Sequence, residues 1–219
     1  MYRFLTIIMA FWSMAATAET DAVQAPVPGQ IISYQFGSGG MLATAGVDWD
    51  SYTKVLLERA TVEFREDWIS DQWKINDSLV REEDAERIKT EMSDLLDKTL
   101  TRKLVDKDGY TLTAESGADV LRFTPRIAKL DIYAPGLAQA FVGHVLIDSK
   151  GSMVLVMDIS DSVSGVLLAS AWQLQVDSEK GYTDSATSAR NRTAFGQMMG
   201  RWATWLVKLL DVVREEAPE

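Results

Sequence analysis

The sequence contains no cysteine and only one histidine, His144. The lack of cysteine excludes disulfides, thiol nucleophiles and thiolate metal sites, and it excludes lipidation of a cysteine next to an export signal. A Ser-His-Asp triad would have to use His144, but the chain has no Gly-x-Ser-x-Gly motif to supply its serine. We therefore predict no catalytic residue and no cofactor, and we expect His144 to be a structural residue.

Two signatures of phosphate binding are missing as well. The run Gly37-Ser38-Gly39-Gly40 is not followed by Lys-Ser or Lys-Thr, as a phosphate loop would require. No run of basic residues offsets the net charge of −10. The field of such a chain repels nucleic acids and anionic lipid headgroups, so we expect no nucleic-acid partner.

Long apolar runs are also absent, because the apolar segment at residues 4–14 is shorter than the roughly 20 residues of a stable membrane span. This segment follows Arg3 and precedes Ala16 and Ala18, which form an A-x-A cleavage site. The order predicts a cleaved export signal, residues 1–18, with Glu19 as the first mature residue; an uncleaved N-terminal anchor is the alternative. We expect a periplasmic or secreted protein whose mature form has no transmembrane span and no lipid anchor through cysteine.

The rest of the chain is predicted to form a flexible tether, residues 19–47, and a single α+β domain, residues 48–215. The tether contains turn residues such as Pro26 and Pro28 and shows no regular periodicity. About 200 residues fit one domain whose core is large enough to be stable without metals or disulfides.

Periodicity along the domain predicts strands and helices. The expected elements are a strand at 52–64, a loop at 66–78, a helix ending near Leu104, a short strand at 110–113, a long strand at 119–133, a hairpin of 152–159 and 166–176, and a C-terminal helix around 195–213. Pro125 predicts an edge or a bulge in the long strand, and Gly165 suits a left-handed hairpin turn. The order β-α-β-β-β-β-α predicts a mostly antiparallel sheet of four to five strands, covered by two helices.

Four segments carry a family resemblance: residues 52–57 leading to Glu63, Phe64 and Trp68; residues 118–122; residues 161–165; and residues 166–169. Together they resemble the bacterial envelope family known as domain of unknown function 3313, over about residues 48–210. The resemblance implies a small α+β periplasmic protein, often a lipoprotein, and it implies no activity. The chain departs from the lipoprotein habit because it lacks the lipidation cysteine.

Three residues are weak candidates for a binding site: Trp68, Trp73 and His144. The two tryptophans could line a sugar-binding cleft, although packing in the core is the favoured interpretation. Paired carboxylates could support glycoside hydrolysis, but in so acidic a chain such pairs also arise by chance.

Acidic turns raise the question of calcium. Residues 106–109 superficially resemble a calcium loop, but the glycine comes two positions too early and no glutamate closes the loop. Asp148, Asp158 and Asp161 flank turns, where aspartate commonly bonds the local backbone. We predict no metal site.

These observations favour a periplasmic accessory or binding protein of the bacterial cell envelope with no evident catalytic site, whose partner is another envelope protein or a small ligand. The alternatives are an exported hydrolase that works through carboxylates and a structural envelope subunit that forms homo-oligomers.

Overall fold

The computed structural model describes residues 7–8, 31–76, 81–108, 110–132, 146–147, 151–176, 184–185 and 188–215. In chain order the elements are β1 (Ile7–Ile8), β2 (Ile31–Phe36), β3 (Gly39–Thr44), the 3-10 helix η1 (Trp49–Ser51), β4 (Lys54–Leu57), β5 (Thr61–Phe64), α1 (Trp68–Asn76), α2 (Glu82–Asp108), β6 (Thr111–Leu112), β7 (Val120–Ile132), β8 (Leu146–Ile147), β9 (Gly151–Asp161), β10 (Leu167–Val176), β11 (Asp184–Ser185) and α3 (Ser188–Glu215). His144, Ala16, Ala18 and Glu19 lie outside the described residues.

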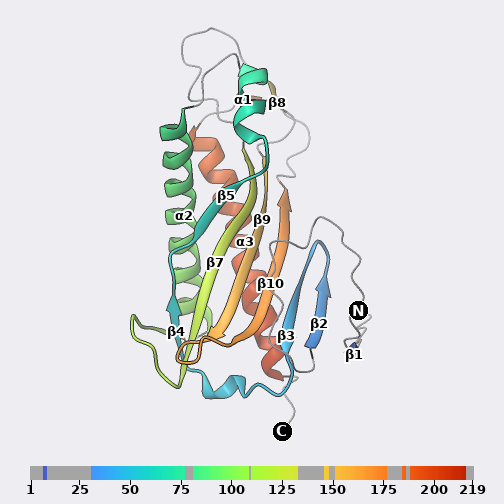
Figure 1. Ribbon diagram of the computed structural model, residues 1–219, viewed down its shortest axis with the longest axis vertical. Helices are drawn as coiled ribbons and strands as arrows, with labels where there is room; N and C mark the ends of the chain where they lie inside the picture. The colour runs from blue at the N-terminus through green and yellow to red at the C-terminus, as the bar shows by residue number, and fades with distance from the viewer. Residues whose placement is uncertain are drawn as a thin grey trace.

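The fold has two layers, with α2 and α3 side by side on one face of a nine-stranded sheet (Figure 1). The strand order is β1-β2-β3-β10-β9-β7-β4-β6, and β5 also pairs with β7. The pairs β4–β6, β4–β7 and β5–β7 are parallel, and the other pairs of this sheet are antiparallel. The predicted α+β class is confirmed, but the sheet is larger and more mixed than predicted, and α1 is a third helix.

The predicted tether is wrong for residues 31–44, which form the hairpin β2–β3 at the side of β10. A Cβ at Gly39 would lie 2.3 Å from the carbonyl oxygen of Trp172, and one at Gly40 would lie 2.6 Å from that of Tyr34. The glycines that suggested a flexible linker instead let neighbouring strands approach closely. Met41 and Tyr34 are buried in the core, so the hairpin is part of the domain.

The predicted strand at 52–64 is two strands, because the connection at Ala60 is held by α2. The Ala60 N–H donates to Asp97 Oδ1 at 3.0 Å, and Ser93 Oγ donates to the Ala60 carbonyl at 2.7 Å. β4 and β5 consequently pair with successive parts of β7.

The predicted loop at 66–78 is also wrong, since residues 68–76 form α1. Trp68 fixes this helix to the core: its side chain is 1% exposed, stacks on Phe64 with a 3.9 Å centroid distance, and donates from Nε1 to the Ile132 carbonyl at 2.8 Å. The contacts that stabilise α1 are therefore long-range, and local periodicity did not reveal them.

β7 is the long strand that the sequence predicted, and it is central rather than at an edge. The backbone carbonyl of Phe123 accepts a hydrogen bond from Glu58 N, so the backbone groups of Phe123 face the β4–β5 side. This direction repeats every second residue along a strand, so the backbone of Pro125 faces the same side. Pro125 lies between the part of β7 that pairs with β4 and the part that pairs with β5, where no donor is needed. The bulge comes later, around Lys129, whose φ is 51°.

The two predicted long helices and the predicted hairpin are confirmed. One side of the sheet packs on the helices through alternate residues such as Met153, Leu155 and Met157 of β9, which are fully buried. The apolar arc of α3 is buried against them, as the sequence predicted: Phe195, Met198, Met199, Trp202, Leu206, Leu209 and Leu210. Within the described residues, no helix is both long enough and apolar enough to cross a membrane.

Candidate functional site

The β9–β10 turn is organised around the carboxylate of Asp161. Its Oδ1 accepts hydrogen bonds from Val163 N at 3.2 Å, Ser164 N at 2.7 Å and Ser164 Oγ at 2.7 Å. Gly165 has a φ of 71°, the left-handed geometry that the sequence predicted for it. The hydrogen bonds, those from Ser164 first, hold the pKa of Asp161 below its usual value. The result is a fixed turn that leaves Val163 68% exposed at its tip.

Neighbouring segments brace this turn from outside the hairpin. Tyr52 Oη donates to Asp161 Oδ2 at 3.1 Å, and burial, followed by this bond, raises the pKa of the Tyr52 hydroxyl. Ser162 Oγ lies 3.0 Å from both the N and the O of Gly117. The turn is thus tied to the segments that precede β4 and β7, and both oxygens of Asp161 accept hydrogen bonds within this network.

The sheet face opposite the helices carries a set of paired charges. Arg122 lies 3.3 Å from Glu58, which also accepts a hydrogen bond from Thr124 Oγ1 at 3.2 Å. On the next strand, Asp158 accepts from Arg126 Nη2 at 2.9 Å and from Ser170 Oγ at 2.5 Å.

These charges neutralise one another across β4, β7, β9 and β10. Asp158, whose side chain is 12% exposed, has its two oxygens engaged by Arg126 and Ser170, so it joins β9 to both neighbouring strands.

The same face carries apolar side chains along β10, which we call the β10 stripe: Trp172, Leu174 and Val176. Leu174 is 45% exposed and Val176 is 48% exposed, while Trp172 is half-buried with its ring over β3. Leu174 pairs across the sheet with Val154, which extends the apolar surface onto β9. Sequence patterns did not predict this stripe, although apolar residues at both parities of one strand are a usable signal for it.

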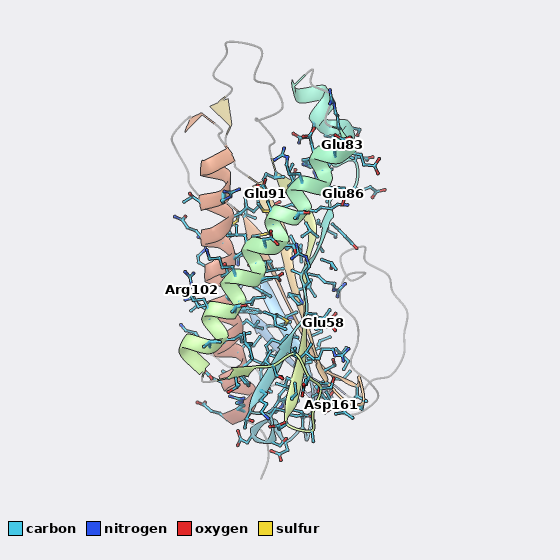
Figure 2. The ribbon with its side chains drawn as sticks, turned by 90° about the vertical axis from the view of Figure 1, so that its left-hand side faces the viewer. Glu58, Glu83, Glu86, Glu91, Arg102 and Asp161 are labelled. Atoms are coloured by element: carbon cyan, nitrogen blue, oxygen red, sulfur yellow. The ribbon has the colours of Figure 1, made fainter. Side chains whose placement is uncertain are left out.

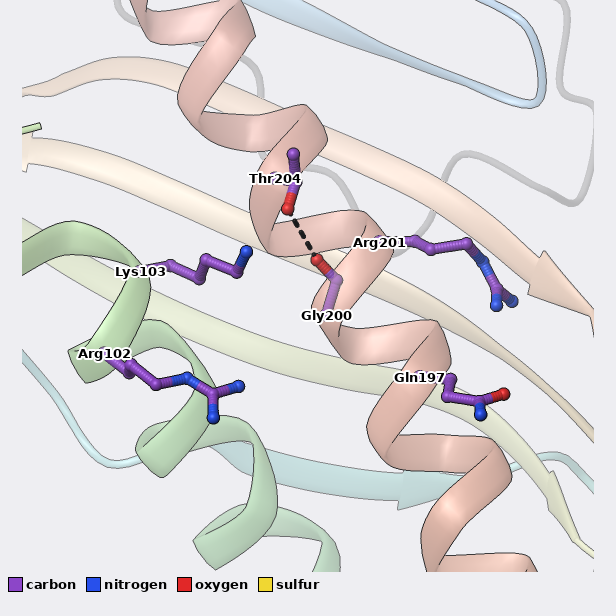
Figure 3. Close-up of a pocket in the computed structure, with 6 residues that line it drawn as sticks. All are labelled: Arg102, Lys103, Gln197, Gly200, Arg201 and Thr204. Carbon is purple, nitrogen blue, oxygen red and sulfur yellow. Dashed lines mark hydrogen bonds between the residues drawn. The ribbon is translucent and has the colours of Figure 1, made fainter. Parts of the chain in front are cut away.

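A hollow of about 500 Å³ lies between the two long helices, lined by Arg102, Lys103, Gln197, Gly200, Arg201 and Thr204. In Figure 3, Arg102 and Lys103 extend from α2 toward α3, whereas Arg201 projects from α3 on the side away from α2. A Cβ added at Gly200 would meet nothing within 4 Å, so this glycine leaves open space at the floor. The sequence showed no basic run here because the cations come from different helices.

The three candidate binding residues are not brought together by the described structure. Trp68 packs in the core, which is the interpretation that the sequence favoured for the tryptophans. Trp73 belongs to α1, but its side chain lies outside the described residues, as does all of His144.

Acidic groups of the described residues form no cluster of three or more metal-binding side chains. Burial raises the pKa of Asp97, the feature expected of a catalytic acid. One oxygen of Asp97 accepts the Ala60 N–H, and the other lies 3.9 Å from Arg59. These contacts give Asp97 a role in joining α2 to the β4–β5 connection.

Solved structures similar to this chain include three bacterial proteins. The PelC dodecamer from Paraburkholderia phytofirmans is 10% identical, with a TM-score of 0.33 over 74% of this chain and 95% of that chain. Protein XCC0632 from Xanthomonas campestris, of family DUF330, is 13% identical, with a TM-score of 0.37 over 74% and 84%. A putative neuraminyllactose-binding hemagglutinin homolog from Helicobacter pylori is 13% identical, with a TM-score of 0.33 over 79% and 90%.

No curated protein matches the sequence. The model of a family described as "Protein of unknown function (DUF3313)" matches residues 41–205. This range includes β3, which the sequence analysis had placed in the tether, and it ends within α3. The match confirms the resemblance that was based on four short segments. The chain belongs to the DUF3313 family of proteins of unknown function.

Proposed function

We propose that this protein is an exported accessory protein of the bacterial envelope that binds another envelope protein through the β10 stripe. The observation that carries the proposal is the exposure of Leu174 and Val176 at successive outward positions of one strand. The solvent face of a sheet with one covered side is normally polar, so apolar residues at these positions are expected to be covered by a partner.

The surroundings of the stripe fit a protein surface as the partner. Trp172 offers a large apolar ring, and tryptophan is among the residues that contribute most to protein interfaces. Beside it, the ion pairs formed by Arg126 and Arg122 give the polar rim that surrounds the apolar centre of such interfaces.

Site-specific photo-crosslinking in the source bacterium tests the binding surface. A photoreactive residue at Leu174 should give a crosslinked band of defined mass, whereas the same residue at Thr90, which is exposed on α2, should give none. The double variant Leu174→Asp and Val176→Asp should remove the band from a probe at Trp172. Equal crosslinking from positions 174 and 90, or none from either, would contradict the proposal. A product with twice the mass of the chain would support the homo-oligomeric alternative instead.

Fractionation tests the proposed location. The mass of the protein from the periplasm should correspond to a chain that begins at Glu19. A full-length chain in the cytosol would remove the export part of the proposal, while the crosslinking result would still decide the binding part.

A further inference from the structure

The two long helices carry basic side chains that have no ion-pair partner among the described residues: Lys98, Arg102, Lys103, Arg201 and Lys208. Near the start of α2, by contrast, the basic side chains are in ion pairs. There Arg87 lies 3.3 Å from both Asp84 and Glu91, and Arg192 of α3 lies 3.1 Å from Glu91. Figure 2 shows Glu83, Glu86 and Glu91 on this half of α2, with Arg102 on the other half.

Such a concentration of positive charge is unexpected in a chain with a net charge of −10. Like charges on neighbouring helical turns repel one another, and the repulsion is relieved when an anion binds between them. Two acids on the same part of α2 are directed elsewhere: Asp97 contacts Ala60 and Arg59, and Asp94 lies 2.7 Å from Arg59.

The hollow between the helices is the place where these cations meet a space for a ligand. Three of them, Arg102, Lys103 and Arg201, line its walls, and Gly200 leaves its floor open. Thr204 adds a hydroxyl whose proton is donated to the Gly200 carbonyl at 2.9 Å, so its oxygen can still accept a hydrogen bond (Figure 3).

The chemistry of the lining selects the class of ligand. Arg102 and Lys103, which extend toward α3, present a guanidinium and an ammonium group that match a phosphomonoester, which carries close to two negative charges near pH 7 and accepts paired hydrogen bonds from arginine. The hollow is about 500 Å³ and wide open to solvent, so it leaves room around a bound phosphate group for the organic part of a ligand. We infer that the hollow between α2 and α3 binds an organic phosphomonoester, either as a soluble molecule or as the headgroup of a lipid.

Two probes test the inference on the purified protein. Titration with glycerol 3-phosphate, followed by calorimetry, measures binding of a soluble phosphomonoester. Cosedimentation with phosphatidylcholine vesicles that contain phosphatidic acid measures binding of the same group on a lipid, with pure phosphatidylcholine vesicles as the blank. Binding in the first assay assigns a soluble ligand, and binding in the second assay alone assigns a lipid headgroup.

Variants connect the binding to the hollow. Arg102→Gln and Arg201→Gln should each weaken binding by about tenfold, the effect of one charge-assisted hydrogen bond. Gly200→Leu should abolish it by filling the floor, and the open space there leaves room for the helix to form normally. Lys208→Gln is the matched control, because it removes the same charge from α3 outside the lining and should change binding by less than about threefold. Absence of binding in both assays, or equal binding by the wild type, Arg102→Gln and Arg201→Gln, would overturn the inference.

Discussion

Replacing Asp161 by alanine is the most direct test of how the β9–β10 turn is stabilised. The change removes three acceptor contacts at the exposed tip, worth about 0.5 kcal/mol each, and the half-buried contact with Tyr52, worth about 1 kcal/mol. We therefore expect the free energy of unfolding to fall by about 2–3 kcal/mol. Asp161→Asn keeps an Oδ1 acceptor for the turn and should cost about 1 kcal/mol.

The pH dependence of the Asp161→Asn variant provides a second, independent check. The pKa of Asp161 in the folded protein is lowered, chiefly by the Ser164 hydroxyl, so its carboxylate contributes stability that is fully present above the unfolded pKa of about 3.9. That contribution is lost as the pH falls through the lower folded pKa. The difference between the wild type and Asp161→Asn should therefore be largest at neutral pH and should shrink in strongly acidic buffer.

Urea unfolding followed by tryptophan fluorescence measures these differences. Tyr52→Phe and Ser164→Ala are matched controls that each remove part of the network. Combined with Asp161→Ala, Tyr52→Phe should add less than its single effect, because both changes remove the same hydrogen bond. A loss below about 0.5 kcal/mol for Asp161→Ala, or full additivity in the double variant, would refute this account of the turn.

Three further changes probe other parts of the molecule. Asp158→Ala should lower the free energy of unfolding by about 2 kcal/mol, because it removes the mostly buried carboxylate that accepts hydrogen bonds from Arg126 and Ser170. Asp94→Ala, at an exposed pair, should cost under about 0.5 kcal/mol, and similar losses in urea unfolding would contradict the difference in burial. Gly200→Ala should raise the free energy of unfolding by about 0.5–1 kcal/mol, because alanine favours the helix and its Cβ meets no neighbouring atom. A lower melting temperature for this variant would show that the space beside Gly200 is not open. Burial raises the pKa of Asp97 in the folded protein, so the wild type loses stability as the pH rises from the unfolded to the folded pKa. Asp97→Asn can still accept the Ala60 N–H and should lose this pH dependence. A stability-versus-pH curve that is the same for the wild type and Asp97→Asn would contradict the assignment.

Local sequence patterns predicted the elements that are specified by residues close together in the chain. The apolar period of α3, the hairpin of β9 and β10, and the left-handed position of Gly165 are each indicated by short windows of sequence, and each is present in the structure. The family was also recognisable from four short segments, and the match over residues 41–205 confirms it.

Elements that depend on distant contacts were not predicted. α1 is held by the hydrogen bond from Trp68 to Ile132, which is 64 residues away. Gly39 and Gly40 predict a flexible tether where the structure has the β2–β3 hairpin. Their role is apparent only from the close approach of Trp172 and Tyr34 of the adjacent strands. A glycine that allows a turn and a glycine that allows close packing are the same residue in a sequence.

The sequence by itself determined the α+β class, the two long helices, the hairpin and the lack of thiol chemistry, because composition and short-range periodicity are properties of consecutive residues. Only the tertiary structure decided where the basic hollow and the exposed β10 stripe arise. Arg102 and Arg201 are far apart in the chain and line one hollow because α2 and α3 pack side by side. The exposure of Leu174 was likewise decided by the position of both long helices on the opposite face of the sheet.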